Sequence, residues 1–144
     1  MEPVHKVVVV TGGGKGIGAA LCRRFAAEGA AKVVVADIDF ALAKDVAAEI
    51  DGLAVACNVA DEADVKSLVD TVIDSCGRID VFISNAGITV KGGLESSNED
   101  WQRMWDVNVM SRLFAARAVV PQMLEQGSGY LIHTASAAGV LTEI

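Results

Sequence analysis

Five glycines stand close together in residues 11–18, where their backbone could hold a phosphate group. They are Gly12, Gly13, Gly14, Gly16 and Gly18. Because glycine lacks a Cβ and tolerates positive φ, the backbone N–H groups of such a loop can approach a pyrophosphate closely. A helix that begins near Ile17 would point the positive end of its dipole at the same phosphate. Read as Gly14-x-Gly16-x-x-Ala19, the segment fits the dinucleotide-binding fingerprint.

A carboxylate follows at the distance that this fingerprint requires. Asp37 comes about 20 residues after the loop and closes the apolar run 33–36. There it could accept hydrogen bonds from both ribose hydroxyls, and its charge would repel a 2′-phosphate. Lys15 opposes this preference, but its side chain is free to turn toward solvent. The residues therefore favour NAD as cofactor, with NADP as the less favoured alternative.

Other interpretations of the glycine loop stay open at this point. A purely structural turn, or a nucleotide-binding module without catalysis, would need no further residues. A methyltransferase that uses S-adenosylmethionine would also suit Gly14-x-Gly16-x-Gly18 followed by a carboxylate after the second strand. A kinase-like P-loop is excluded, because Lys15 is followed by Gly16 and not by Ser or Thr.

Strand-like apolar runs alternate with helix-like segments along the chain. The expected strands cover residues 4–10, 33–36, 53–57, 79–83 and 130–134. The expected helices cover residues 17–28, 40–50, 61–76 and 98–126, and Asn98 is the expected N-cap of the last one. Strands of nearly continuous Val and Ile are typical of a parallel sheet with helices on both faces. The pattern predicts one α/β domain over residues 1–144, a doubly wound parallel sheet of the Rossmann type.

The overall composition excludes several classes of function. The net charge of −7 argues against a nucleic-acid surface, which needs clustered Lys and Arg. No apolar run approaches the roughly 20 residues of a membrane-spanning helix, and no targeting pattern opens the chain, so we expect a cytoplasmic protein. Cys22, Cys57 and Cys76 are widely spaced and predict free thiols. With only His5 and His133 as histidines, a metal site is not expected.

The motifs taken together resemble those of the short-chain dehydrogenase/reductase family in its compact form, over essentially the whole chain. Thr11-Gly12-x-x-x-Gly16-x-Gly18 resembles the family's cofactor loop. Ser84-Asn85-Ala86-Gly87 resembles its Asn-Asn-Ala-Gly motif, which lines the cofactor ribose, and residues 58–59 stand where the family usually has Asp-Val against the adenine ring. The cofactor-binding candidates are therefore Gly12, Gly14, Gly16, Ile17, Gly18, Asp37, Asn58, Val59, Asn85, Ala86 and Gly87.

Two further positions match catalytic residues of that family. Ser136 lies where the family has its catalytic serine, which the resemblance implies would hydrogen-bond the reacting oxygen. Asn108 matches the family's helix-bending asparagine, which the resemblance implies helps to hold a water in a proton relay. The implied activity is an NAD(P)-dependent oxidoreductase that moves hydride between nicotinamide and a carbonyl or secondary alcohol carbon. The identity of this small-molecule substrate does not follow from these residues.

The family's Tyr-x-x-x-Lys pair has no match after Ser136. The single tyrosine, Tyr130, precedes Ser136 on the same expected strand by roughly 20 Å, so we expect it to be structural. We therefore expect the chain to be a fragment that lacks the last strands of the fold and is inactive on its own.

The stretch 107–124 is apolar around most of its circumference, and a helix of this kind expects cover on all sides. By resemblance, this helix would pair two copies, so we expect a homodimer or homotetramer from the full-length protein. Trp101 and Trp105 lie four residues apart just before this stretch and are expected to pack in the core.

Overall fold

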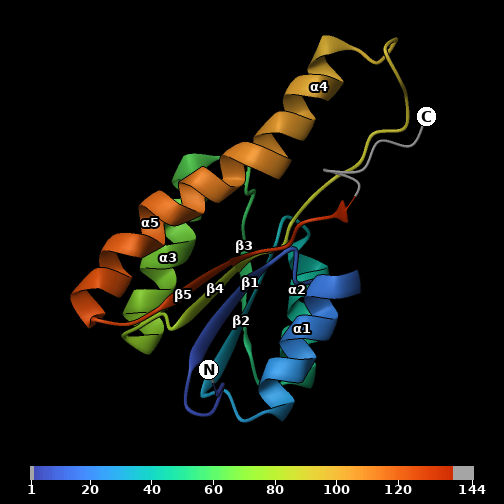
Figure 1. Ribbon diagram of the computed structural model, residues 1–144. Helices are drawn as coiled ribbons and strands as arrows, with labels where there is room; N and C mark the ends of the chain where they lie inside the picture. The colour runs from blue at the N-terminus through green and yellow to red at the C-terminus, as the bar shows by residue number, and fades with distance from the viewer. Residues whose placement is uncertain (1, 138–144) are drawn as a thin grey trace.

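β-branched residues form the strands at the centre of the molecule. The computed structural model describes residues 2–137, in which five parallel strands form one sheet in the order β3-β2-β1-β4-β5 (Figure 1). These strands are β1 (Val7–Thr11), β2 (Lys32–Asp37), β3 (Leu53–Ala56), β4 (Val81–Ser84) and β5 (Tyr130–His133). Val8, Val9 and Val10 are fully buried, which suits β-branched side chains in a strand covered on both faces.

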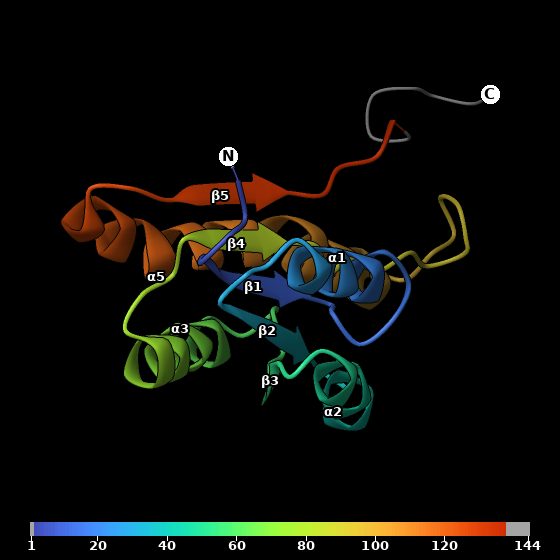
Figure 2. The ribbon, with the colours of Figure 1, turned by 90° about the horizontal axis from the view of Figure 1, so that it is seen from below.

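Helices cover both faces of the sheet, as Figure 2 shows. They are α1 (Gly16–Ala27) and α2 (Phe40–Glu49) on one face, and α3 (Glu62–Cys76) and α5 (Ser111–Gln126) on the other. Side chains alternate along β1, so Val8 and Val10 pack toward the first pair of helices and Val9 packs toward the second. The chain places β2 and β3 on one side of β1, and β4 and β5 on the other. The predicted doubly wound α/β fold is therefore confirmed, with its switch point between β1 and β4.

Ser97 begins the helix α4 (Asn98–Trp105) and corrects one prediction. Its hydroxyl oxygen accepts the N–H of Asp100 at 3.1 Å, which satisfies one of the free donors in the first turn. Asn98 is already helical, so the prediction that it is the N-cap was wrong by one residue.

The helix predicted over residues 98–126 is interrupted. A π-helical turn, Asp106–Met110 (η1), follows α4, and α5 begins after it. α4 extends beyond the sheet in Figure 1 and buries none of its residues. Trp101 and Trp105 are 54% and 55% exposed, so the prediction that they pack in the core was wrong. The reason is that α4 runs past the end of the sheet, where no other layer of residues 2–137 covers it.

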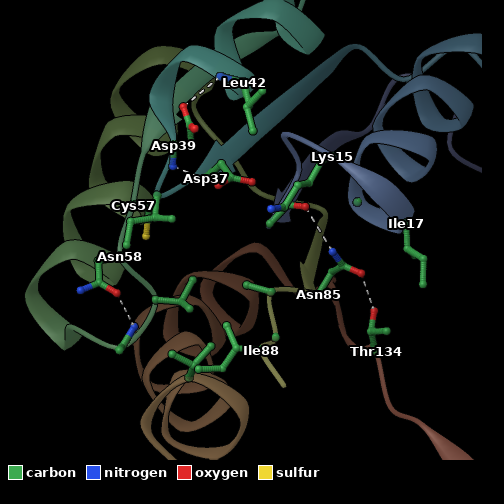
Figure 3. A pocket seen from close by; sticks show the side chains of 18 of the residues that line it. Lys15, Ile17, Asp37, Asp39, Leu42, Cys57, Asn58, Asn85, Ile88 and Thr134 are labelled. Carbon is green, nitrogen blue, oxygen red and sulfur yellow. Dashed lines mark hydrogen bonds between the residues drawn. The ribbon is translucent and has the colours of Figure 1, made fainter. Parts of the chain in front are cut away.

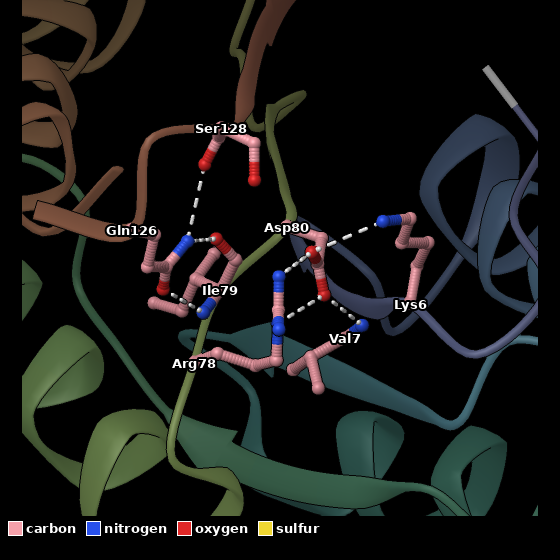
Figure 4. Close-up of polar contacts among 7 residues, drawn as sticks. All are labelled: Lys6, Val7, Arg78, Ile79, Asp80, Gln126 and Ser128. Carbon is pink, nitrogen blue, oxygen red and sulfur yellow. Dashed lines mark hydrogen bonds and ion pairs between the residues drawn. The ribbon is translucent and has the colours of Figure 1, made fainter. Parts of the chain in front are cut away.

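A polar cluster secures the amino ends of β1 and β4 (Figure 4). The buried Asp80 carboxylate accepts the Val7 N–H at 3.0 Å and two N–H groups of Arg78 at 2.7 and 3.0 Å. Burial alone would raise the pKa of Asp80. The hydrogen bonds from Arg78 and Val7, with the charges of Arg78 and Lys6, outweigh burial and hold that pKa below its ordinary value. The two strands therefore start in a fixed register, which also sets where their other ends lie.

Candidate functional site

A cavity of about 720 Å³ opens at the carboxyl ends of the strands, beside the switch point between β1 and β4 (Figure 3). Ligands of doubly wound sheets bind at this place. Nine of the residues predicted from the sequence line the cavity: Gly12, Ile17, Gly18, Asp37, Asn58, Val59, Asn85, Ala86 and Gly87. Gly14, Gly16, Asn108 and Ser136 are not part of its lining. The fold thus brings four separate segments of the chain to one cavity.

Two positions of the glycine loop have no room for a side chain. At Gly18, an added Cβ would overlap the carbonyl oxygen of Gly12 and lie 2.7 Å from Nδ2 of Asn85. At Gly12, φ is +63° and an added Cβ would lie 2.9 Å from the Cα of Ala86. The loop backbone therefore runs directly against the first turn of α1 and against the segment after β4. A bare backbone cradle at the start of a helix suits a phosphate group.

Asp37 ends β2 and both lines the cavity and braces the glycine loop. Its Oδ2 accepts the N–H of Gly14 at 2.9 Å, and its Oδ1 accepts the N–H of Asp39 at 3.0 Å. The N–H groups of Gly14 and Asp39 thus hold the Asp37 carboxylate in place. Each carboxylate oxygen can accept a further hydrogen bond, so the side chain can still receive two hydroxyl groups from the cavity. Lys15, from the same loop, also lines the cavity.

Asn85 joins the carboxyl ends of three strands. Its Nδ2 donates to the carbonyl oxygens of Thr11 at 3.1 Å and Gly12 at 3.4 Å, and its Oδ1 accepts the hydroxyl of Thr134 at 3.1 Å. In return, the Thr11 hydroxyl oxygen accepts the N–H groups of Asn85 and Ala86 at 3.0 and 3.2 Å. β1, β4 and the end of β5 are therefore held side by side around the cavity.

The far end of the cavity is formed after β3. Asn58 accepts the N–H of Ala60 at its own Oδ1, at 3.2 Å, while its backbone N–H donates to Asp64 at 3.0 Å. These bonds shape the turn that presents Val59 to the cavity. Burial, and then the nearby charges of Asp64 and Asp61, raise the pKa of the Cys57 thiol to about 12. Cys57 therefore lines the cavity as a neutral, unreactive thiol.

The two residues predicted to be catalytic lie near the cavity but outside its lining. Asn108, in the π-helical turn, donates from Nδ2 to the Ile88 carbonyl and accepts the Ile88 N–H at Oδ1, each at 2.9 Å. Because Ile88 lines the cavity, Asn108 supports the cavity wall through it. Ser136 is exposed, two residues beyond Thr134, which lines the cavity. Tyr130 lies at the opposite end of β5.

Sequence reasoning missed two residues that hold this wall together. Thr134 bonds to Asn85, and Arg112 donates to the carbonyl oxygens of Asn108 and Thr134. The partners of Arg112 include a backbone group 22 residues away, which no local pattern indicates.

Within residues 2–137, no three His, Cys, Asp or Glu side chains gather closely enough to hold a metal ion. No helix in that part of the chain is both long and apolar enough to cross a membrane.

A doubly wound parallel sheet with a glycine cradle at its switch point defines a nucleotide-binding protein of the Rossmann class. The family can be stated more closely, because the model of the short chain dehydrogenase family matches residues 6–144. The chain belongs to that family. This membership lends no support to the methyltransferase alternative.

Two relatives of the chain are dehydrogenases of about twice its length. The chain is 39% identical over 140 residues to meso-2,3-butanediol dehydrogenase of Serratia marcescens, covering 94% of this chain and 55% of that protein. It is 35% identical over 141 residues to 2,5-dichloro-2,5-cyclohexadiene-1,4-diol dehydrogenase of Sphingobium indicum, covering 94% and 56%. The chain thus spans about half the length of these curated relatives.

Solved structures agree with the fold. A short chain dehydrogenase/reductase from Burkholderia phymatum, in complex with NAD, superposes with a TM-score of 0.94 at 34% identity, covering 99% of this chain and 53% of that one. A 7α-hydroxysteroid dehydrogenase, complexed with NADH and 7-oxo glycochenodeoxycholic acid, superposes with a TM-score of 0.92 at 31% identity, covering 99% and 58%.

Proposed function

We propose that this chain is the dinucleotide-binding half of an NAD-dependent oxidoreductase. The proposed reaction transfers hydride between nicotinamide and a carbonyl or secondary alcohol carbon. The observation that carries the proposal is that nine predicted cofactor contacts, from four separate segments, line one cavity. Stability alone does not explain the glycine cradle, since glycine costs chain entropy on folding. The diol and hydroxysteroid dehydrogenases among the relatives support a small alcohol or carbonyl compound as the substrate class.

The cavity offers a separate contact for each part of such a cofactor. The backbone at Gly12 and Gly18 fits a pyrophosphate, and Asp37 fits the adenosine ribose. Residues 58–59 would contact the adenine edge, and residues 85–87 would contact the second ribose. When bound, the nicotinamide ring supplies the hydride chemistry.

Two residues of the chain are proposed to serve the reacting oxygen. Ser136 would donate a hydrogen bond to it, and Asn108 would support the proton relay. A serine hydroxyl is too weak an acid to supply the proton itself, and general acid–base catalysis contributes about 10² to 10⁴-fold. The single tyrosine, Tyr130, lies at the wrong end of β5 to take that role. We therefore propose that these 144 residues bind the cofactor but do not turn over substrate alone.

An assay of reduced-cofactor absorbance tests this division of roles. The chain would be compared with a longer version that carries a Tyr-x-x-x-Lys pair after Ser136, on a panel of secondary alcohols with NAD. The proposal expects turnover only from the longer version. Comparable turnover by both would refute the assignment of the catalytic groups. Absence of turnover in both, with cofactor bound, would favour the second candidate, a nucleotide-binding module without catalysis. The observation behind this candidate is that Tyr130 lies at the start of β5, away from the cavity.

The proposed cofactor preference is NAD over NADP. The Asp37 carboxylate, only 8% exposed and held by two N–H groups, cannot turn away from a 2′-phosphate. Lys15 is exposed and can turn away, so it compensates little of the repulsion. Titration of both cofactors tests the preference, and tighter binding of NADP would contradict it.

We further propose that the full-length protein is a homodimer or homotetramer. Trp105, Val109 and Leu113 recur along α4, η1 and α5 at every fourth residue and are each at least 42% exposed. An exposed apolar stripe of this kind is typical of a surface that packs against another surface. Light scattering tests this, and a monodisperse monomer of the longer version would contradict it.

A further inference from the structure

The side chain of Arg112 forms two hydrogen bonds, and both acceptors are backbone carbonyl groups and not carboxylates. Its Nη1 donates to the carbonyl oxygen of Asn108, and its Nη2 donates to that of Thr134 at 2.7 Å. The residue is half-buried in the first turn of α5. A guanidinium group offers its donors in a rigid planar fork, so one side chain can hold two acceptors at a fixed separation.

Each of these two acceptors belongs to a segment that shapes the cavity. The side chain of Asn108 holds the backbone of Ile88, and the hydroxyl of Thr134 holds the side chain of Asn85. Asn85 and Ile88 are three residues apart in the same loop, and both line the cavity, as does Thr134. The hydrogen bonds therefore close a ring that runs through the loop, the π-helical turn, Arg112 and the end of β5.

The π-helical turn gives this ring one of its acceptors. The Asn108 carbonyl lies in the middle of η1, where the regular ladder of helix hydrogen bonds is interrupted. The side chain of Arg112, one turn later, donates to this carbonyl and at the same time reaches across to Thr134, just after β5. Arg112 is thus bonded both to the π-helical turn and to the segment after β5, and not only to its own helix α5.

We propose that Arg112 is a positioning residue: it holds the loop 85–88 and the segment from Thr134 to Ser136 at the separation that the nicotinamide end of the cofactor requires. This inference rests on the function proposed above. The pyrophosphate and adenosine contacts lie at the glycine loop, Asp37 and residues 58–59, outside the ring. The effect of Arg112 is therefore confined to one end of the cavity.

Two ligands separate the two ends of the cavity. NAD carries the nicotinamide ring and its ribose, and ADP lacks both. We expect Arg112→Gln to weaken NAD binding roughly threefold to tenfold, the scale of one intramolecular hydrogen bond, and to leave ADP binding unchanged. Arg112→Lys, which keeps the charge but not the fork, should restore part of the loss. The matched control is Arg117→Gln, since Arg117 lies on the same helix and pairs with the exposed Glu62 outside the cavity.

Amide hydrogen exchange gives a second, local measurement. The Ile88 N–H donates to Asn108 and the Thr134 N–H donates to Ser84. Both should exchange faster in Arg112→Gln, while the N–H of the fully buried Val9 should not change. Unchanged NAD binding and exchange would overturn the proposal. Equal weakening of both ligands, or unfolding of Arg112→Lys, would also overturn it and assign Arg112 to general stability. If the parent chain binds neither ligand, the proposed function itself fails.

Discussion

Gly18→Ala should disrupt the glycine cradle more than any exposed substitution in the loop. The added Cβ would overlap the Gly12 carbonyl oxygen and lie 2.7 Å from the Gly12 carbonyl carbon and from Asn85 Nδ2. The Gly12 carbonyl is part of the backbone and cannot swing aside as a flexible side chain would, so the cost lies at the upper end of the about 1–3 kcal/mol typical of overpacking. Replacing glycine by alanine within a helix returns only about 1 kcal/mol. We therefore expect a net loss of roughly 2 kcal/mol in the free energy of unfolding.

Urea unfolding and NAD titration measure the two consequences. Gly77→Ala is the matched control, because Gly77 caps α3 at φ +76° with nothing within 4 Å of an added Cβ. The control should lose about 1 kcal/mol to left-handed strain and keep its affinity for NAD. Gly18→Ala should lose more stability and bind NAD at least roughly tenfold more weakly, since the cradle must open to relieve the overlap. A Gly18→Ala variant with the stability and NAD affinity of the parent would refute this reasoning.

Three further predictions concern single side chains. Asp80→Asn should lower the free energy of unfolding by roughly 2 kcal/mol, because it leaves buried donors poorly paired. The pKa of Asp80 is lowered in the folded state, so the extra stability of the parent over Asp80→Asn should be present above pH 3.8, the ordinary pKa, and should disappear as the pH falls through the pKa of the folded state. Urea unfolding at a series of pH values measures this difference. Asp37→Ala should narrow the difference between the Kd values for NAD and NADP. An unchanged ratio of the two Kd values would contradict the role of Asp37 in cofactor preference. Burial and then the charge of Arg112 lower the pKa of His133, so NMR titration of Arg112→Gln should find that pKa raised.

The strands could be predicted because the signal is local. Runs such as Val7 to Val10 are apolar without alternation, and only a strand buried on both faces accommodates them. The first strand was predicted to begin at residue 4 and begins at Val7, because His5 has a φ of 63° that no strand allows. That turn depends on the His5 N–H donating to Gly29 at the far end of α1, a contact that the local sequence does not show.

The failures around α4 have a common physical cause. Ser97 and Asn98 have equal capping chemistry, so sequence alone could not decide between them. The four-residue spacing of Trp101 and Trp105 predicts a buried helix face. Whether that face is buried depends on which element packs against the helix, and the spacing carries no information about this. The π-helical turn likewise contains a tertiary pairing that the local sequence does not show, between Asn108 and a loop 20 residues earlier.

The residues of the candidate site could be predicted from the sequence only in part, for the same reason. Residues that act through their own backbone, such as Gly12 and Gly18, could be found from type and spacing, because glycine is needed wherever a Cβ would collide. Arg112 and Thr134 act on carbonyl and amide groups that meet only in the folded chain, so their types carry no signal of their role.

Calorimetric titration of NAD into the folded chain tests the central claim most directly. Circular dichroism would first establish that the chain is folded, and S-adenosylmethionine would be titrated in parallel. The account predicts saturable binding of NAD at one site, weakened in Gly18→Ala, with no comparable binding of S-adenosylmethionine. A folded chain that takes up no NAD at millimolar concentration, or that binds S-adenosylmethionine more tightly, would contradict it.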